Sequence, residues 1–213
     1  MILLNEKTRS HLTELIGELN ETVDLLSFKS DTECQTCNDT IRYLEEISAL
    51  NSKIRMKVFD RDSDKQQFEK FDITKVPAIV IKGKRSSSSG IKFYGIPSGY
   101  EVHSLIAAIK RVSKATKPID IKLKERILCI NKKVNILVFV TPTCPNCPDV
   151  VIAAHTLAFY NTLITCTVIE CGTFSSLASE YNVKNVPKTI INDIHSINGL
   201  LTLNDLISFI ENL

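Results

Sequence analysis

Residues 134–149 read VNILVFVTPTCPNCPD, an apolar and β-branched run that stops at a turn carrying Cys144 and Cys147. The run predicts a buried strand over residues 134–140, and the apolar spacing after the turn predicts a helix over residues 144–160. A Cys-x-x-Cys motif between a strand and a helix is typical of a redox centre that makes and breaks a disulfide.

Thiol–disulfide exchange requires two sulfurs within bonding distance, one of which is a good nucleophile. Residues i and i+3 on a helix have Cβ atoms about 5–6 Å apart, close to the range of a disulfide. Unpaired N–H groups and the positive end of the helix dipole stabilise a thiolate at the first position. We therefore predict that Cys144 is the attacking nucleophile and that Cys147 is the resolving thiol. Pro148 lacks an N–H, so we expect an irregular first helical turn.

The same arrangement occurs a second time, as CQTC with Cys34 and Cys37. The distance from the first cysteine to a Val-Pro pair is 77 − 34 = 43 residues in one half and 187 − 144 = 43 in the other. Around these prolines, FDITKVPAIVI and YNVKNVPKTII align without a gap at an offset of 110. A duplicated unit accounts for this repeat. The apolar pattern lapses near residue 115, which predicts one unit over residues 1–115 and another over 116–213.

Each unit has the expected order helix, strand, helix, strand, helix, Val-Pro, hairpin, helix. The expected elements of the first unit cover residues 5–20, 23–28, 41–50, 54–58, 63–71, 78–81, 91–96 and 102–112. Those of the second unit cover residues 123–130, 134–140, 144–160, 165–171, 175–181, 188–191, 196–200 and 203–213. The polar run at residues 82–90 contains four serines and predicts a solvated hairpin tip.

That order, with a cysteine pair after the first strand and a proline opening the third, resembles the thioredoxin fold. The resemblance implies an α/β protein of two tandem thioredoxin-fold units, each a mixed central sheet flanked by helices. It also implies that Pro77 and Pro187 follow cis peptide bonds and lie beside the cysteines. With Val76 and Val186 they are the expected substrate-binding residues, because such a proline leaves neighbouring backbone groups free to pair with an extended chain.

Two such units in one chain resemble the glutaredoxin-like protein disulfide oxidoreductases of thermophilic archaea and bacteria. The resemblance includes KFYGIPSGYE at residues 92–101 and TPTCPNCP at residues 141–148. The second half, with NCPDVV and GTF, is also similar to the N-terminal module of the flavoprotein component of alkyl hydroperoxide reductase. That module lacks a Cys-x-x-Cys motif in its first half, whereas this chain has Cys34 and Cys37 there.

This sequence departs from the thioredoxin pattern at two places. The buried carboxylate that thioredoxins carry six residues before the first cysteine falls on Phe28 and Val138, so that route for the proton is absent. The dipeptides between the cysteines, Gln-Thr and Pro-Asn, are those of neither thioredoxin nor glutaredoxin. Because this dipeptide tunes the reduction potential, the direction of electron flow stays open.

The resemblance predicts an enzyme, a dithiol–disulfide oxidoreductase acting on protein disulfides or dithiols, with Cys144/Cys147 as its main centre and Cys34/Cys37 as its second. The alternative is an electron carrier from a thioredoxin reductase-like flavoprotein to a peroxiredoxin. A zinc-stapled or chaperone-like binding module is the non-catalytic alternative. The two motifs are 144 − 37 = 107 residues apart, each at an expected helix start, which disfavours a shared zinc site. We expect neither a cofactor nor a metal.

The two centres differ in the charge that precedes them. Asp31 and Glu33 lie just before Cys34, and like charge raises the pKa of a thiol. The residues before Cys144, Thr-Pro-Thr, are neutral. We therefore expect Cys144 to be the more reactive cysteine.

The remaining cysteines and His155 are expected to be structural. Cys129 lies on an expected helix as a small core residue. Cys166 and Cys171 are five apart on one expected strand, about 16 Å from each other and on opposite faces, so they should be unpaired. His155 lies eleven residues beyond Cys144, about 16 Å along the helix, too far for a catalytic base.

The composition indicates a globular protein, with 213 residues, 44% hydrophobic and 23% charged. A net charge of +2 is too small to indicate binding to nucleic acid or to an anionic membrane. The N-terminal residues lack the features of a secretory signal, and no apolar run reaches 18 residues. Seven cysteines, an odd number, disfavour a secreted disulfide framework. We expect a soluble, cytoplasmic protein.

Overall fold

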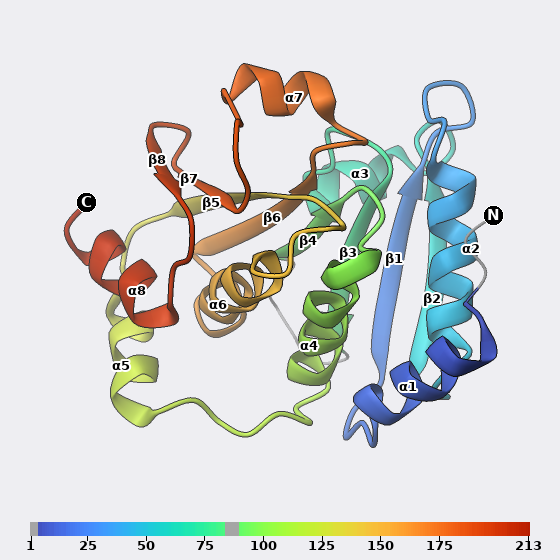
Figure 1. Ribbon diagram of the computed structural model, residues 1–213, viewed down its shortest axis with the longest axis horizontal. Coiled ribbons are helices and arrows are strands. Elements are labelled where there is room, and N and C mark those ends of the chain that lie inside the picture. The colour runs from blue at the N-terminus through green and yellow to red at the C-terminus, as the bar shows by residue number, and fades with distance from the viewer. Residues whose placement is uncertain (1–3, 84–89) are drawn as a thin grey trace.

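The computed structural model describes residues 4–83 and 90–213, and its centre is one eight-stranded sheet in the order β2-β1-β3-β4-β6-β5-β7-β8 (Figure 1). The elements of the first half are α1 (Glu6–Ile16), β1 (Val23–Lys29), α2 (Cys37–Ser48), β2 (Ile54–Asp60), α3 (Lys65–Phe71), β3 (Ala78–Gly83), β4 (Ile91–Tyr94), η1 (Gly99–Glu101) and α4 (Val102–Val112). Those of the second half are α5 (Ile121–Cys129), β5 (Val134–Val140), α6 (Cys147–Tyr160), β6 (Ile164–Glu170), α7 (Ser175–Glu180), β7 (Lys188–Ile191), β8 (His195–Asn198) and α8 (Leu203–Glu211).

The strand order is the same in the two halves. β1 pairs parallel with β2 and antiparallel with β3, and β5 pairs in the same way with β6 and β7. β4 then pairs antiparallel with β3, and β8 pairs antiparallel with β7. The topology therefore repeats as the sequence repeat predicts. The unit boundary near residue 115 falls between α4 and α5, in a stretch without helix or strand, and its exact place stays a prediction.

The two halves share one sheet because β4 pairs parallel with β6, with Ile91 opposite Cys166. Helices α4 and α6 lie side by side on one face across this junction (Figure 1). Alternate strand residues point to opposite faces, so Leu25 belongs to the larger core under α1, α2, α4, α5, α6 and α8, and Leu26 to the smaller core under α3 and α7. The sheet is thus covered on both faces.

The helices that follow the two Cys-x-x-Cys motifs are α2 and α6, and α6 begins later than the sequence predicts. The prediction that the second one begins at Cys144 is wrong, since α6 begins at Cys147, and α2 likewise begins at Cys37. Pro148 becomes the second residue of α6, where a missing N–H costs no intrahelical hydrogen bond. The helix α2 also begins at the second cysteine of its motif, although it has no proline at the equivalent place. Proline alone therefore does not explain where the two helices begin. The outer cysteine of each motif lies in the turn before the helix.

A second correction concerns Cys129, which is the last residue of α5 and is exposed rather than in the core. The same helix buries Ile127 completely. Cys129 comes two residues later, which is about 200° further around the helix axis. Cys129 therefore lies away from the core. The other expected helices and strands are present, with ends that differ by a few residues.

The hairpin tip expected around the four serines falls mainly on residues 84–89, outside the described residues. Within residues 4–83 and 90–213, no helix is both long enough and apolar enough to span a membrane.

Candidate active site

Cys144 and Cys147 form a disulfide with their Cα atoms 5.5 Å apart. Cys147, the first residue of α6, is 0% exposed, and Cys144 is 8% exposed in the turn after β5. The Cys144 N–H donates to the Thr141 carbonyl oxygen at 3.2 Å, which closes this turn. Cys144 is the more accessible sulfur, as an attacking nucleophile must be.

A cavity of about 470 Å³ opens beside Cys144. Its walls come from three segments, namely the turn before α6, the residue after β6 and the loop before β7. The lining residues are Thr141, Thr143, Cys144, Pro145, Asn146, Cys171, Val183, Lys184, Asn185 and Val186. The Val186–Pro187 peptide bond is cis, as the resemblance implies. The fold therefore brings Val186 to the same cavity as the outer cysteine.

The charges around this cavity favour a thiolate. Among the described residues that line it, Lys184 is the one cation, and none carries a carboxylate. The N-terminus of α6 adds the positive end of its dipole. A nearby positive charge and a helix N-terminus both lower the pKa of a thiol, so the reduced form of Cys144 lies in surroundings that stabilise its anion.

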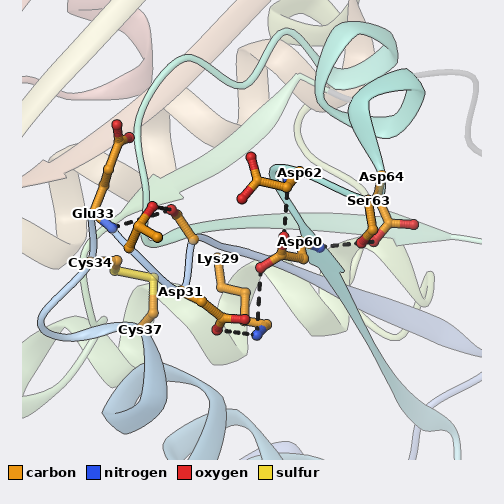
Figure 2. Close-up of polar contacts among 11 residues, drawn as sticks. Lys29, Asp31, Glu33, Cys34, Cys37, Asp60, Asp62, Ser63 and Asp64 are labelled. Carbon is orange, nitrogen blue, oxygen red and sulfur yellow. Dashed lines mark hydrogen bonds and ion pairs between the residues drawn. A yellow bond between two sulfur atoms is a disulfide. The ribbon is translucent and has the colours of Figure 1, made fainter.

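The first centre has the same geometry but lies among more charges. Cys34 and Cys37 form a disulfide with Cα atoms 5.5 Å apart, Cys37 buried and Cys34 half-buried, and the Val76–Pro77 bond is cis. Figure 2 shows the Lys29 ammonium between the carboxylates of Asp31, which is three residues before Cys34, and Asp60.

The acids before Cys34 are not free charges. Asp31 is paired with Lys29, and Glu33 lies 3.2 Å from the Arg61 guanidinium. The hydrogen bond from the Asp62 N–H, followed by the charge of Lys29, holds the pKa of Asp60 below its usual value. Because these ion pairs partly neutralise the acids, the two centres differ less in charge than the sequence predicts. Asp60 adds a third carboxylate, which shares Lys29 with Asp31, so three carboxylates pair with the two cations Lys29 and Arg61.

Comparison with known proteins agrees with this geometry. Residues 134–211 match the family model of the thioredoxin domain. The solved structure of the alkyl hydroperoxide reductase AhpF from Enterococcus faecalis, a mutant form, is 30% identical, covers 97% of this chain and 98% of that one, and superposes with a TM-score of 0.90. The chain belongs to the tandem thioredoxin-fold family of disulfide oxidoreductases.

Two more relatives of this tandem thioredoxin-fold oxidoreductase differ in their names. A protein disulfide oxidoreductase from Aeropyrum pernix is 26% identical, covers 99% of this chain and 94% of that one, and superposes with a TM-score of 0.90. A protein named NADH dehydrogenase from Bacillus subtilis is 26% identical over 87% of this chain and 34% of its own length. The chain spans about a third of the length of the curated relatives that it matches. With two Cys-x-x-Cys disulfides on this fold, the chain is a thiol–disulfide oxidoreductase.

The oxidoreductase also contains a buried carboxylate that the sequence reasoning missed. Glu101 is 1% exposed and ends η1, which contacts α6. Ser104 Oγ donates to Glu101 Oε2 at 2.6 Å, while Oε1 has no hydrogen-bond partner among the described residues. Burial raises the pKa of Glu101 to about 7, although the hydrogen bond from Ser104 opposes this. An acid at the end of KFYGIPSGYE was the available signal.

Glu101 is a buried carboxylate from another part of the fold than the thioredoxin one. Phe28 and Val138, where thioredoxins have a carboxylate, are buried apolar residues, as expected. Glu101 comes instead from the first half of the chain and lies against the helix that begins with Cys147. It is the kind of group that exchanges a proton near neutral pH.

Cys166, Cys171 and His155 take no part in the two disulfides. Cys166 is fully buried in β6, and Cys171, just after β6, lines the cavity of Cys144; both are unpaired, as expected. His155 is buried and packs edge-on against Phe93, with ring centroids 5.0 Å apart. Burial lowers the pKa of His155 to about 3, so its imidazole is neutral in the folded oxidoreductase.

Proposed function

We propose that this oxidoreductase acts on protein disulfides mainly through Cys144, with Cys147 as the resolving thiol. The observation that carries this proposal is the cavity that holds Cys144 and Val186 together, with Lys184 beside them. The Cys144 thiolate attacks one sulfur of a substrate disulfide and forms a mixed disulfide, while the substrate S–S bond breaks and the other sulfur leaves as a thiolate. Cys147 then attacks Cys144 Sγ, which releases the second substrate sulfur as a thiol and leaves the Cys144–Cys147 disulfide. Two electrons pass from the cysteine pair to the substrate.

The backbone beside each cis-proline is the proposed docking site for an extended substrate segment. At the main centre these residues are Val186 and Pro187, and at the second centre they are Val76 and Pro77. Val186 lines the same cavity as Cys144, which supports this assignment at the main centre.

We assign Glu101 the exchange of a proton with Cys147. Cys147 is fully buried, and burial opposes the loss of a proton from a thiol. The carboxylate of Glu101, held against α6 by η1, has a pKa of about 7 and can accept that proton when Cys147 attacks.

The second candidate function is narrower. The likeness to the alkyl hydroperoxide reductase AhpF supports an electron carrier, reduced by a thioredoxin reductase-like flavoprotein and oxidised by a peroxiredoxin. The same cysteine pair and the same exchange chemistry serve this role. What differs is the partner that enters the cavity.

Two activity assays separate these functions. Reduction of insulin disulfides measures general activity, and peroxide turnover with an added flavoprotein reductase and peroxiredoxin measures the carrier role. Cys144→Ser should abolish both, whereas Cys34→Ser should leave most of the activity. Poor insulin reduction combined with efficient peroxide turnover would favour the carrier.

The non-catalytic alternative has its own test. Stoichiometric zinc in the purified protein, with all four Cys-x-x-Cys thiols protected from alkylation, would favour a scaffold. A cytoplasmic location stays a prediction from the sequence, to be tested by cell fractionation.

A further inference from the structure

Cys171 is the second cysteine that lines the Cys144 cavity. It directly follows β6, is half-buried and forms no disulfide. Its N–H donates to the carbonyl oxygen of Val140, the last residue of β5, at 3.0 Å. Val140 precedes Cys144 by four residues. The backbone of Cys171 is therefore anchored beside the turn that carries the proposed nucleophile.

The first half of the chain shows where a side chain at this position reaches. Arg61 is the equivalent residue, since it directly follows β2 and donates its N–H to Lys29, the last residue of β1, at 3.0 Å. The two positions also differ by the repeat offset, 171 − 61 = 110. The Arg61 guanidinium contacts Glu33, the residue before Cys34, at 3.2 Å. The Arg61 side chain thus reaches the turn of Cys34, and Cys171 occupies the equivalent place at the cavity of Cys144.

The other free cysteines among the described residues, Cys129 and Cys166, lie outside the Cys144 cavity. Cys166 is fully buried in the sheet, and Cys129 is exposed at the end of α5. Cys166 therefore provides an inaccessible control for Cys171.

We propose that Cys171 is a second resolving thiol for Cys144. When Cys144 carries a mixed disulfide with a substrate, the Cys171 sulfur attacks Cys144 Sγ. The bond to the substrate breaks and a Cys144–Cys171 disulfide forms. The substrate sulfur leaves with the bonding electron pair and takes up, through solvent, the proton that Cys171 loses. The electron count equals that of resolution by Cys147, so no further oxidant is needed. This inference rests on the proposed role of Cys144 as nucleophile.

Resolution by Cys171 should be the slower of the two routes. Burial, followed by the charge of Glu170, raises the pKa of Cys171 to about 11. Only roughly one thiol in 10⁴ is then ionised at pH 7, and that fraction rises about tenfold for each pH unit up to 10. Cys171 therefore frees Cys144 mainly when Cys147 is unable to act.

The test uses the full chain with Cys34, Cys37 and Cys129 replaced by Ser, which removes the other accessible sulfurs. In this background, Cys147→Ser is compared with Cys147→Ser/Cys171→Ser. Each reduced protein receives one equivalent of dithiobis(nitrobenzoate), which releases one coloured thiolate on labelling Cys144 and a second one on resolution. Peptide mass spectrometry identifies the disulfide formed.

We expect Cys147→Ser to release the second thiolate at least tenfold faster than the double variant, with a rate that rises about tenfold per pH unit from pH 7 to 9. The product should contain the Cys144–Cys171 disulfide. Cys147→Ser/Cys166→Ser, the matched control, should behave like Cys147→Ser. Equal retention of the label by the single and double variants would overturn the inference while leaving Cys144 as the nucleophile. Absence of label on Cys144 in the double variant would overturn the proposed function as well.

Discussion

The N–H of Tyr100 donates to the carbonyl oxygen of Pro142 at 2.9 Å, so a residue of the first half holds the turn that precedes Cys144 in the second half. The neighbouring Gly99 has φ +60°, and a Cβ at this position would overlap the Pro142 oxygen. The main centre therefore depends on a close backbone approach between the two halves.

Gly99→Ala should destabilise the protein and slow exchange at the main centre. The new methyl group must push η1 away from the turn, in addition to the cost of a left-handed backbone for alanine, together about 2–4 kcal/mol. Urea unfolding measures the loss. Gly199→Ala is the matched control, because Gly199 has φ +89° but nothing within 4 Å of its Cβ. Equal losses for the two variants would show that the contact with Pro142 has no effect of its own.

Glu101 should make the protein less stable as the pH rises. Its folded pKa of about 7 lies above the ordinary 4.5 of the unfolded chain, so its contribution is complete below pH 4.5 and is lost as the pH rises through 7. Glu101→Gln removes this dependence. We expect the variant to gain on the order of 1–3 kcal/mol relative to the wild type between pH 5 and pH 8, measured by urea unfolding. A pH-independent difference would show that the carboxylate does not titrate in this range.

The same substitution should alter the resolving step. If Glu101 takes the proton of Cys147, Glu101→Gln should slow release of a substrate from Cys144 at pH 7 by about 10- to 100-fold, while the first attack by Cys144 keeps its rate. Single-turnover measurements separate the two steps. Glu46→Gln is the control, since that carboxylate is also buried but contacts Leu4 and Arg9 in the first half. An unchanged release rate would remove Glu101 from the proton route.

Cys144 should be alkylated before Cys34 in the reduced protein at pH 6–7. The α6 N-terminus and Lys184 favour its thiolate, whereas at the first centre Asp31, Glu33 and Asp60 share only two cations. Timed labelling with iodoacetamide and peptide mass spectrometry gives the order. Earlier modification of Cys34 would contradict the electrostatic ranking of the two centres.

Lys29→Gln should lower the reactivity of Cys34. The variant leaves Asp31 and Asp60 without their cation, and the added negative charge should raise the pKa of the Cys34 thiol and slow its alkylation about 3- to 10-fold at pH 7. Lys57→Gln, which alters a pair with Asp24 elsewhere in the sheet, is the control. Equal alkylation rates in the two variants would mean that Lys29 has no specific effect on this centre.

Much of the fold was predictable because its signals are local. The run of apolar and β-branched residues marked β5, and the 43-residue spacing from cysteine to proline recurred in both halves. The pairing of Cys144 with Cys147 follows from a spacing of three residues at a helix start. Each of these features depends on residues close together in the chain, which a periodicity or a motif describes directly.

Local signals were insufficient where a helix end or a helix face had to be chosen. The start of α6 at Cys147 and the exposure of Cys129 depend on how these helices pack against the rest of the protein. The pairing of Glu33 with Arg61 likewise joins residues 28 positions apart. Charge counted along the sequence therefore exaggerated the difference between the two centres.

By itself, the sequence determined two Cys-x-x-Cys centres on a repeated thioredoxin-like unit, since motif, spacing and apolar period are properties of short segments. Only the tertiary structure decided what surrounds Cys144. Glu101 approaches α6 from the other half because β4 pairs with β6, and Cys171, 27 residues from Cys144, reaches its cavity because β6 pairs with β5. Such pairings are set by packing between elements far apart in the chain, which no local pattern records.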